Sequence, residues 1–187
     1  MRRVFAIAFG IGLISCGEGS TPTPTGETYI AFGSSFGGYE GWEKFDLAAA
    51  EAPQDGGIPL SDAGCPSGHD TSAHRVGYLN KRPPSGSTEF PVGTIIVKEM
   101  QKGTSPDTWQ IFAMVKRGGG FNPNGAKNWE WFEIKRDPKL PLVVWRGVGP
   151  PAGEGYGSPA CGGCNSCHGA AASNDYVLSP QFNLKNF

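Results

Sequence analysis

Three cysteines and a histidine lie within eight residues towards the C-terminal end of the chain. The sequence CGGCNSCH contains two overlapping Cys-x-x-Cys pairs, Cys161 with Cys164 and Cys164 with Cys167, followed by His168. Such a cluster can bind zinc, form a redox-active disulfide, or attach a haem group covalently. Only the second pair is followed directly by a histidine, and this detail separates the three chemistries.

The zinc and disulfide hypotheses explain this spacing less well than haem attachment does. Zinc takes about four ligands in a tetrahedron, and the adjacent residues Cys167 and His168 cannot easily both join Cys164 around one small ion. A thioredoxin-like Cys-x-x-Cys occurs beside a β-α-β unit. The sequence predicts no such unit after residue 160.

Covalent haem attachment uses both thiols and the histidine. Two thiols one helical turn apart add to the two vinyl groups of haem, and the following histidine carries its imidazole to the iron. We therefore predict one haem c, with thioether bonds at Cys164 and Cys167 and with His168 as the proximal ligand. No methionine or histidine follows His168, so a sixth ligand must come from upstream. The candidates are Met100, Met114, His69, His74 and Lys98; if none reaches the iron, one position stays open to a small ligand.

The first residues, MRRVFAIAFGIGLISC, have the pattern of an export signal. Arg2 and Arg3 form a positive segment, and the apolar run Val4–Ser15 is too short to span a bilayer. The motif LISC resembles a bacterial lipobox, whose cysteine becomes the lipidated first residue of the mature chain. We expect lipidation of Cys16 and a periplasmic location, lipid-anchored to a membrane, with the outer membrane favoured. A plain secretory signal is the alternative.

Three segments are expected along the chain. Residues 1–15 form the signal peptide, 16–27 the lipidated cysteine with a flexible tether rich in Gly, Ser, Thr and Pro, and 28–187 a single haem domain. Because disulfides persist after export, Cys65 and Cys161 are expected to pair, with two free buried thiols as the alternative. A net charge of −1 without a basic cluster argues against nucleic acid as a partner.

The middle of the chain predicts a mainly antiparallel β-sheet with a few helices, an α+β fold. The alanine-rich stretch 39–52 has apolar residues near helical spacing and predicts a helix. Residues 118–128 predict a long turn. Short segments rich in β-branched and aromatic residues predict strands at 74–80, 93–100, 109–117, 129–136 and 142–147.

Lys98 has two interpretations. Alternation along residues 94–100 places Lys98 on one strand face with Ile96 and Met100, and Glu99 on the other face. In the first interpretation the lysine snorkels from a sheet edge to water. In the second it points into an apolar pocket, where desolvation disfavours its charge and makes the amine a nucleophile.

Three segments together resemble the cytochrome P-460 family: FPVGTIIVKEM (90–100), NWEWFEI (128–134) and CNSCHGAAASNDYVLS (164–179). They occur in the family's order and at suitable intervals, and the resemblance covers residues 74–179. The combination of the Gly-Thr-x-x-Val-Lys-Glu strand with a later Cys-x-x-Cys-His is specific, whereas either motif alone is not. The insert at 53–73 lies outside the resemblance.

The resemblance implies a mainly antiparallel β domain, usually a homodimer, with one c-type haem and His168 as its proximal ligand. In the cross-linked members, the lysine of the strand motif bonds through its amine to the haem macrocycle, and Lys98 occupies that place. Those members oxidise hydroxylamine, and their relatives bind or detoxify nitric oxide. The related cytochromes c′-beta have an apolar, aromatic-lined distal pocket and no cross-link.

Three functions are therefore in view. The leading hypothesis is an enzyme that oxidises hydroxylamine, or another small nitrogen-oxide substrate, and passes electrons to a redox acceptor protein. The second is a nitric oxide-binding or gas-sensing protein, for which Phe112, Met114 and Met100 would supply an apolar distal pocket. The third is an electron-transfer lipoprotein with Met100 or Met114 as sixth ligand.

Hydroxylamine oxidation also needs a proton acceptor. Glu99, Glu130 and Glu133 are candidates because they lie close to the family motifs, although a carboxylate on a strand is more often simply solvated. The sequence does not choose between them.

Overall fold

A computed structural model of the chain describes residues 26–47, 73–149 and 163–187. The signal sequence, lipidated Cys16, His69 and the Cys65–Cys161 pair lie outside these residues and stay predictions. Within the described ranges, no helix is both long and apolar enough to cross a membrane.

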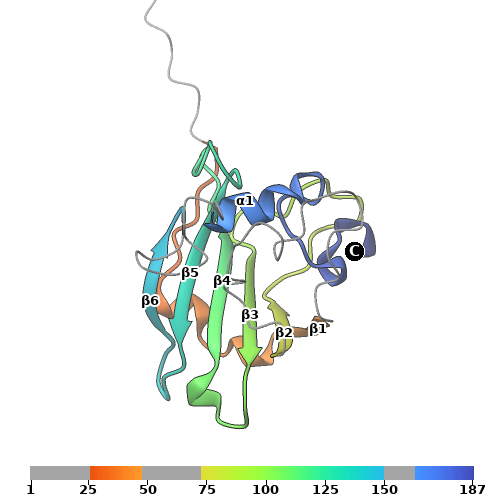
Figure 1. The fold of residues 1–187 in the computed structure, drawn as a ribbon. Helices are drawn as coiled ribbons and strands as arrows, with labels where there is room; N and C mark the ends of the chain where they lie inside the picture. Colours follow the sequence, from red (N-terminus) through yellow and green to blue (C-terminus); the bar gives the residue numbers. More distant parts are fainter. Residues whose placement is uncertain (1–25, 48–72, 150–162) are drawn as a thin grey trace, which may run out of the picture.

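Six antiparallel strands form one sheet, and their order in the sheet is their order in the chain (Figure 1). Each strand is rich in β-branched and aromatic residues, which fit a pleated, half-buried surface. Their bounds are β1 Glu43–Leu47, β2 His74–Leu79, β3 Ile95–Gln101, β4 Gln110–Lys116, β5 Trp129–Lys135 and β6 Leu142–Gly147. The prediction of a mainly antiparallel sheet is confirmed, and residues 118–128 form the predicted turn.

The helices are few and short. The one α-helix is α1, Gly163–Gly169, among the residues that the structure describes. Single 3-10 turns make up the rest: η1 Gly33–Phe36, η2 Tyr39–Gly41, η3 Pro106–Thr108, η5 Ala172–Asn174, η6 Pro180–Phe182 and η7 Leu184–Asn186.

The helix expected over residues 39–52 is wrong for its described part. Residues 43–47 form β1, which pairs with β2 from Glu43 opposite Leu79 to Leu47 opposite Arg75. Pairing with the open edge of β2 satisfies the backbone groups of β1, and this outweighs local helix propensity.

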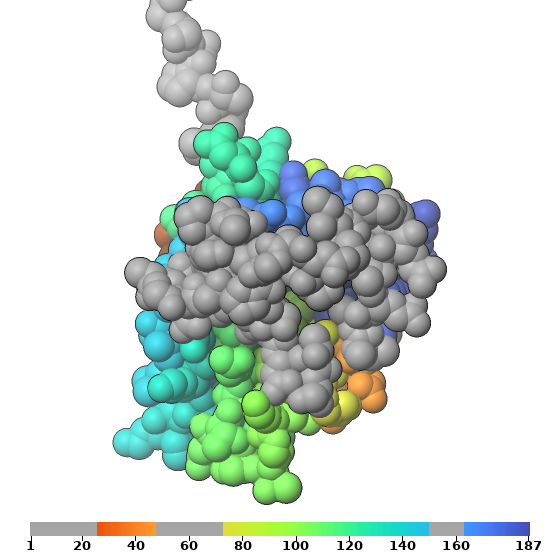
Figure 2. All heavy atoms as spheres, in the orientation of Figure 1, coloured from red at the N-terminus to blue at the C-terminus, as the bar shows by residue number. Residues whose placement is uncertain are grey.

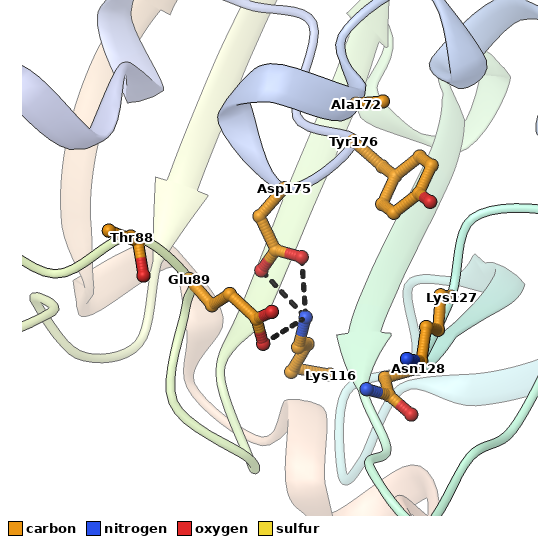
Figure 3. Close-up of a pocket in the computed structure, with 8 residues that line it drawn as sticks. All are labelled: Thr88, Glu89, Lys116, Lys127, Asn128, Ala172, Asp175 and Tyr176. Carbon is orange, nitrogen blue, oxygen red and sulfur yellow. Dashed lines mark hydrogen bonds and ion pairs between the residues drawn. The ribbon is translucent and has the colours of Figure 1, made fainter.

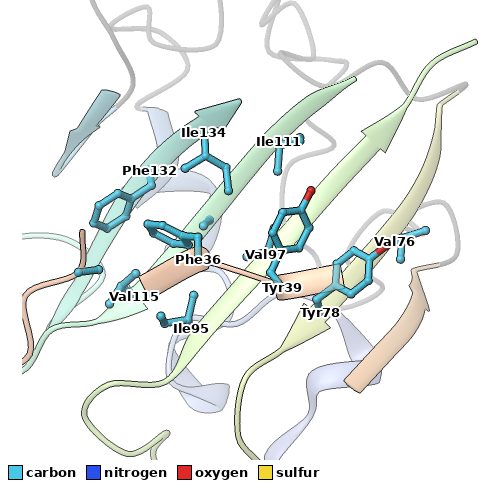
Figure 4. Packing of buried hydrophobic residues seen from close by; sticks show 12 residues of the cluster. Phe36, Tyr39, Val76, Tyr78, Ile95, Val97, Ile111, Val115, Phe132 and Ile134 are labelled. Carbon is cyan, nitrogen blue, oxygen red and sulfur yellow. The ribbon is translucent and has the colours of Figure 1, made fainter. Parts of the chain in front are cut away.

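One face of the sheet is covered by the N-terminal segment (Figure 4). Phe36 and Tyr39 pack onto strand residues that include Val97 and Phe132, and the two phenyl rings of Phe36 and Phe132 lie 5.2 Å apart. Two carboxylates, Glu99 and Glu130, are buried beside this largely apolar cluster. The first face is therefore a closed core.

The other face carries α1 and the C-terminal 3-10 turns (Figure 1). Ile96, Met114 and Trp131 come from three neighbouring strands of this face and pack together, and Cys164 of α1 packs against them. In Figure 2 the turn between β4 and β5 lies at the same end of the molecule as α1, while the β3–β4 connection forms the opposite end. The cysteine-histidine motif thus lies over one end of the second face.

Candidate haem-binding site

The attachment motif lies within α1. Cys164 and Cys167 are one helical turn apart, both are half-buried, and both are free thiols. Burial raises the pKa of the Cys164 thiol to about 11 and also raises that of Cys167. Both sulfurs are therefore neutral thiols in apolar surroundings, as expected beside an apolar macrocycle.

His168 is held in one tautomer by the backbone. Its Nδ1 lies 2.7 Å from the carbonyl oxygen of Tyr176, and because a carbonyl only accepts, Nδ1 must carry the proton. Nε2 is then left with its lone pair, which is the form that binds a metal. Burial lowers the pKa of His168 to about 4, so the imidazole is neutral at physiological pH. The ring also packs on Trp131, with centroids 4.5 Å apart.

Asn165, between the two thiols, fixes α1 to the sheet. Its Oδ1 accepts hydrogen bonds from Asn122 Nδ2 at 2.7 Å, from the Ala126 backbone N–H at 3.1 Å and from Trp131 Nε1 at 3.0 Å. Its Nδ2 donates to Asn122 Oδ1 at 3.1 Å and to the Val148 carbonyl at 2.7 Å. Sequence reasoning missed this role, since Asn165 occupies a variable position of the Cys-x-x-Cys-His motif.

Lys98 lies on the α1 side of the sheet, as the strand alternation predicted. Its neighbours across the strands are Gly77 on β2 and Phe112 on β4, and its Nζ lies 5.6 Å from the centre of the Phe112 ring. Burial, and then the nearby charge of Arg75, lower the pKa of Lys98 to about 8. At pH 7 about one-tenth of the amine is therefore neutral, far more than for a lysine in water. Lys98 is half-buried on this face, and its lowered pKa favours the pocket interpretation over the snorkelling one.

The structure brings Lys98 and the attachment motif together, although they are far apart in the sequence. The amine is close enough to both thiols and to His168 to affect their pKa values electrostatically. Lys98, with its lowered pKa, the two thiols and the neutral imidazole of His168 therefore lie on the same, α1 side of the sheet.

The apolar residues predicted for a distal pocket share this face. Met114 lies in the same cross-strand row as Ile96 and Trp131, and Phe112 lies in the next row with Lys98. Met100 is fully buried one row further from α1.

His74 lies still further away, at the rim of the sheet. It is exposed, and both of its ring nitrogens have hydrogen-bond partners, Gln101 and Asp46. It is therefore not positioned as a sixth ligand.

The three candidate carboxylates are divided between the faces. Glu99 is fully buried in the opposite core, where Tyr39 and Tyr78 donate to it and Arg136 pairs with it. Glu130 is also on that side.

Glu133 is the one candidate on the α1 face. It lies beside Phe112 in the row of Lys98, at a register shift between β5 and β6. Bulges of this kind often reorient side chains near active sites.

Arg75 was not predicted from the sequence. It lies on the α1 face opposite Met100, and its Nε is buried without a hydrogen-bond partner among the described residues. A buried guanidinium nitrogen without an acceptor suits the carboxylate of an anionic ligand, such as a haem propionate. The alternation Arg75, Gly77, Leu79 along β2 was the signal that could have revealed it.

The donor set fits a covalent haem. Two free thiols at one-turn spacing and a neutral imidazole with a free Nε2 lie beside an apolar, aromatic surface. On the same face, the Nε of Arg75 has no acceptor among the described residues. Over the described residues, no three His, Cys, Asp or Glu side chains are grouped so as to hold a metal ion by themselves.

Comparisons with known proteins add nothing to this picture. No protein-family model, no curated protein and no solved structure matches the chain. The expected likeness to the cytochrome P-460 family rests on the three sequence segments alone.

Proposed function

We propose that this protein holds one haem c through Cys164, Cys167 and His168 and oxidises hydroxylamine or a related small nitrogen compound. The observation that carries the proposal is the position of Lys98, a lysine with a lowered pKa beside the attachment motif. When bound, haem supplies a redox-active iron with a position open to a small ligand. Electrons from the substrate then pass to an acceptor protein.

Lys98 is proposed to bond to the haem macrocycle through its amine. Its neutral form has the lone pair that a new N–C bond requires, and the pKa of about 8 makes this form accessible. The bond replaces one N–H and one C–H bond, so two protons and two electrons leave to an oxidant of the peroxide class. A second protein–haem link of this kind would alter the electronic properties of the cofactor.

Two further side chains have proposed roles at this face. Glu133 is positioned to accept a proton from the bound substrate, because it lies in the same cross-strand row as Lys98 and Phe112. Arg75 would pair with a haem carboxylate, which would satisfy its buried Nε.

Nitric oxide binding is a second candidate function, favoured by the aromatic and apolar character of the face. Phe112, Met114 and Trp131 lie close together on β4 and β5, and such side chains make an apolar surface that suits a small neutral ligand. In that case Lys98 would stay unbonded. In an electron-transfer protein, by contrast, Met114 or Met100 would complete six-coordinate iron.

Cellular location and assembly belong to the same proposal. Lipidation of Cys16 would anchor the haem domain at the periplasmic side of a membrane, the outer membrane being favoured, through the tether that ends at residue 27. We also propose that the domain acts as a homodimer.

The test is to produce the chain in a host that attaches haem c, and to compare it with K98A and K98R variants. Wild type should consume hydroxylamine with an electron acceptor and show a strongly red-shifted Soret band in the ferrous state. Both variants should have an ordinary c-type spectrum, because neither can form the N–C bond. A wild-type protein with an ordinary spectrum, no hydroxylamine consumption and reversible nitric oxide binding would favour the second function. A low-spin six-coordinate spectrum would favour the third.

A further inference from the structure

The segment that contacts His168 has an unusual backbone. Asp175 and Tyr176 follow η5 and have φ angles of 51° and 66°, in the left-handed region that favours glycine. Aspartate tolerates this conformation, but for Tyr176 it costs about 1–2 kcal/mol, so surrounding contacts must hold the turn in place. The carbonyl oxygen that this turn presents is the acceptor for His168 Nδ1.

Asp175 supplies those contacts. Its carboxylate is 5% exposed and accepts from Lys116 Nζ at 2.5 and 2.7 Å and from the Phe90 backbone N–H at 2.9 Å. Its own carbonyl accepts from Trp129 Nε1 at 2.8 Å. Four hydrogen bonds thus fix one residue directly before Tyr176.

Lys116 anchors the carboxylate to the sheet. Figure 3 shows its amine between the carboxylates of Asp175 and Glu89. Lys116 is the last residue of β4, is 2% exposed, and lies 5.3 Å from the centre of the Trp129 ring. Glu89 approaches the same amine at 3.7 Å. Removing one partner from such a buried pair leaves an uncompensated charge, which costs far more than breaking a surface ion pair.

We propose that the Lys116–Asp175 ion pair is a positioning device for the proximal histidine, which sets the direction and strength of the hydrogen bond from His168 to the Tyr176 carbonyl. This inference rests on the proposed haem attachment at His168. A histidine that donates firmly from Nδ1 is a more basic ligand through Nε2 and favours ferric over ferrous iron. Neither Lys116 nor Asp175 touches the attachment motif; both act through Tyr176.

The test compares the haem-loaded wild type with D175N, K116M and K116R. Loss of the ion pair in D175N or K116M should loosen the Tyr176 carbonyl and lower the iron–histidine stretching frequency in resonance Raman spectra. It should also shift the ferric–ferrous equilibrium towards ferrous iron. The expected shift is about tenfold, the lower end of the range by which losing a hydrogen-bond partner of a metal-bound histidine changes the properties of a metal site. For a one-electron couple this is a rise of about 59 mV in midpoint potential. K116R keeps the charge and should stay close to wild type.

E130Q is the matched control. Glu130 is as buried as Asp175 and binds Arg146 at 2.7 and 2.8 Å, but it lies on the other face of the sheet. Its replacement should lower the Tm without moving the midpoint potential or the Raman band. If D175N does not fold, K116M compared with K116R tests the same contact. The polar cavity of about 170 Å³ beside Lys116 has room for water to solvate the Asp175 carboxylate when the lysine is replaced.

The outcomes are distinct. A shifted potential and Raman band in D175N or K116M, absent in E130Q, supports the inference. Histidine-ligated haem with an unchanged potential and band in both variants overturns it. A wild-type protein that carries no covalent haem overturns the proposed function instead.

Discussion

Replacing Asn165 with alanine should lower the free energy of unfolding by about 3 kcal/mol. The variant leaves the Ala126 N–H and Trp131 Nε1 without their acceptor, while Asn122 Nδ2 keeps two others, the carbonyls of Ala126 and Trp129. Each buried donor without a partner costs about 1–3 kcal/mol, and two such donors account for the expected total.

Urea unfolding of the haem-loaded protein, followed by far-UV circular dichroism, measures this difference. N186A is the control, because Asn186 is exposed and its side chain makes one hydrogen bond, to the Pro180 carbonyl. Its free energy of unfolding should change by less than about 0.5 kcal/mol. An N165A variant as stable as N186A would refute the assigned role of Asn165 in fixing α1.

Gly125 provides a second, independent check of the same contact. A Cβ atom at Gly125 would lie 2.3 Å from the Asn165 side chain, so G125A alone should cost about 1–3 kcal/mol through overpacking. In the N165A background the space is free, and G125A should cost much less. Additive effects of the two substitutions would show that Gly125 and Asn165 do not meet as the structure has them.

Three other predictions concern the chemistry. E133Q should lower hydroxylamine turnover by about 10²–10⁴-fold while the optical spectrum stays unchanged, whereas E99Q should unfold more readily because its carboxylate belongs to the opposite core. In the haem-free protein the folded state holds His168 at a pKa of about 4, below its ordinary 6.5, so protons bind the unfolded chain more tightly. Its stability relative to an H168N variant should therefore fall by up to about 3 kcal/mol as the pH drops from 7 to 4, as urea titrations at each pH would show. An R75M variant should retain covalent haem but bind it less rigidly, measurable as broadened haem NMR resonances; unchanged resonances would remove Arg75 from the site.

Strand alternation predicted much of the sheet and the side on which Lys98 lies. It worked because a strand with one closed core must place successive residues on opposite faces. Alternation alone puts Glu130 and Glu133 on opposite faces of β5. Knowing that Glu133 shares the face of Lys98 needs the register between strands, which a single sequence does not contain.

Other features depend on contacts between distant parts of the chain. Residues 43–47 become a strand because β2 offers an open edge, and local propensity cannot show this. The side chain of Asn165 is satisfied by residues 17 to 43 positions away, and the backbone at Asp175 and Tyr176 is held by Lys116. Tertiary contacts, rather than propensity, decide these conformations.

The intact mass of the denatured protein tests the central claim most directly. The account predicts the mass of the mature chain plus one haem, less two hydrogen atoms for the Lys98 bond, with the K98A variant retaining its haem and lacking this loss. Haem addition without the loss of two hydrogens would leave the attachment at Cys164 and Cys167 intact and remove the cross-link. A chain that carries no haem after denaturation would contradict the account.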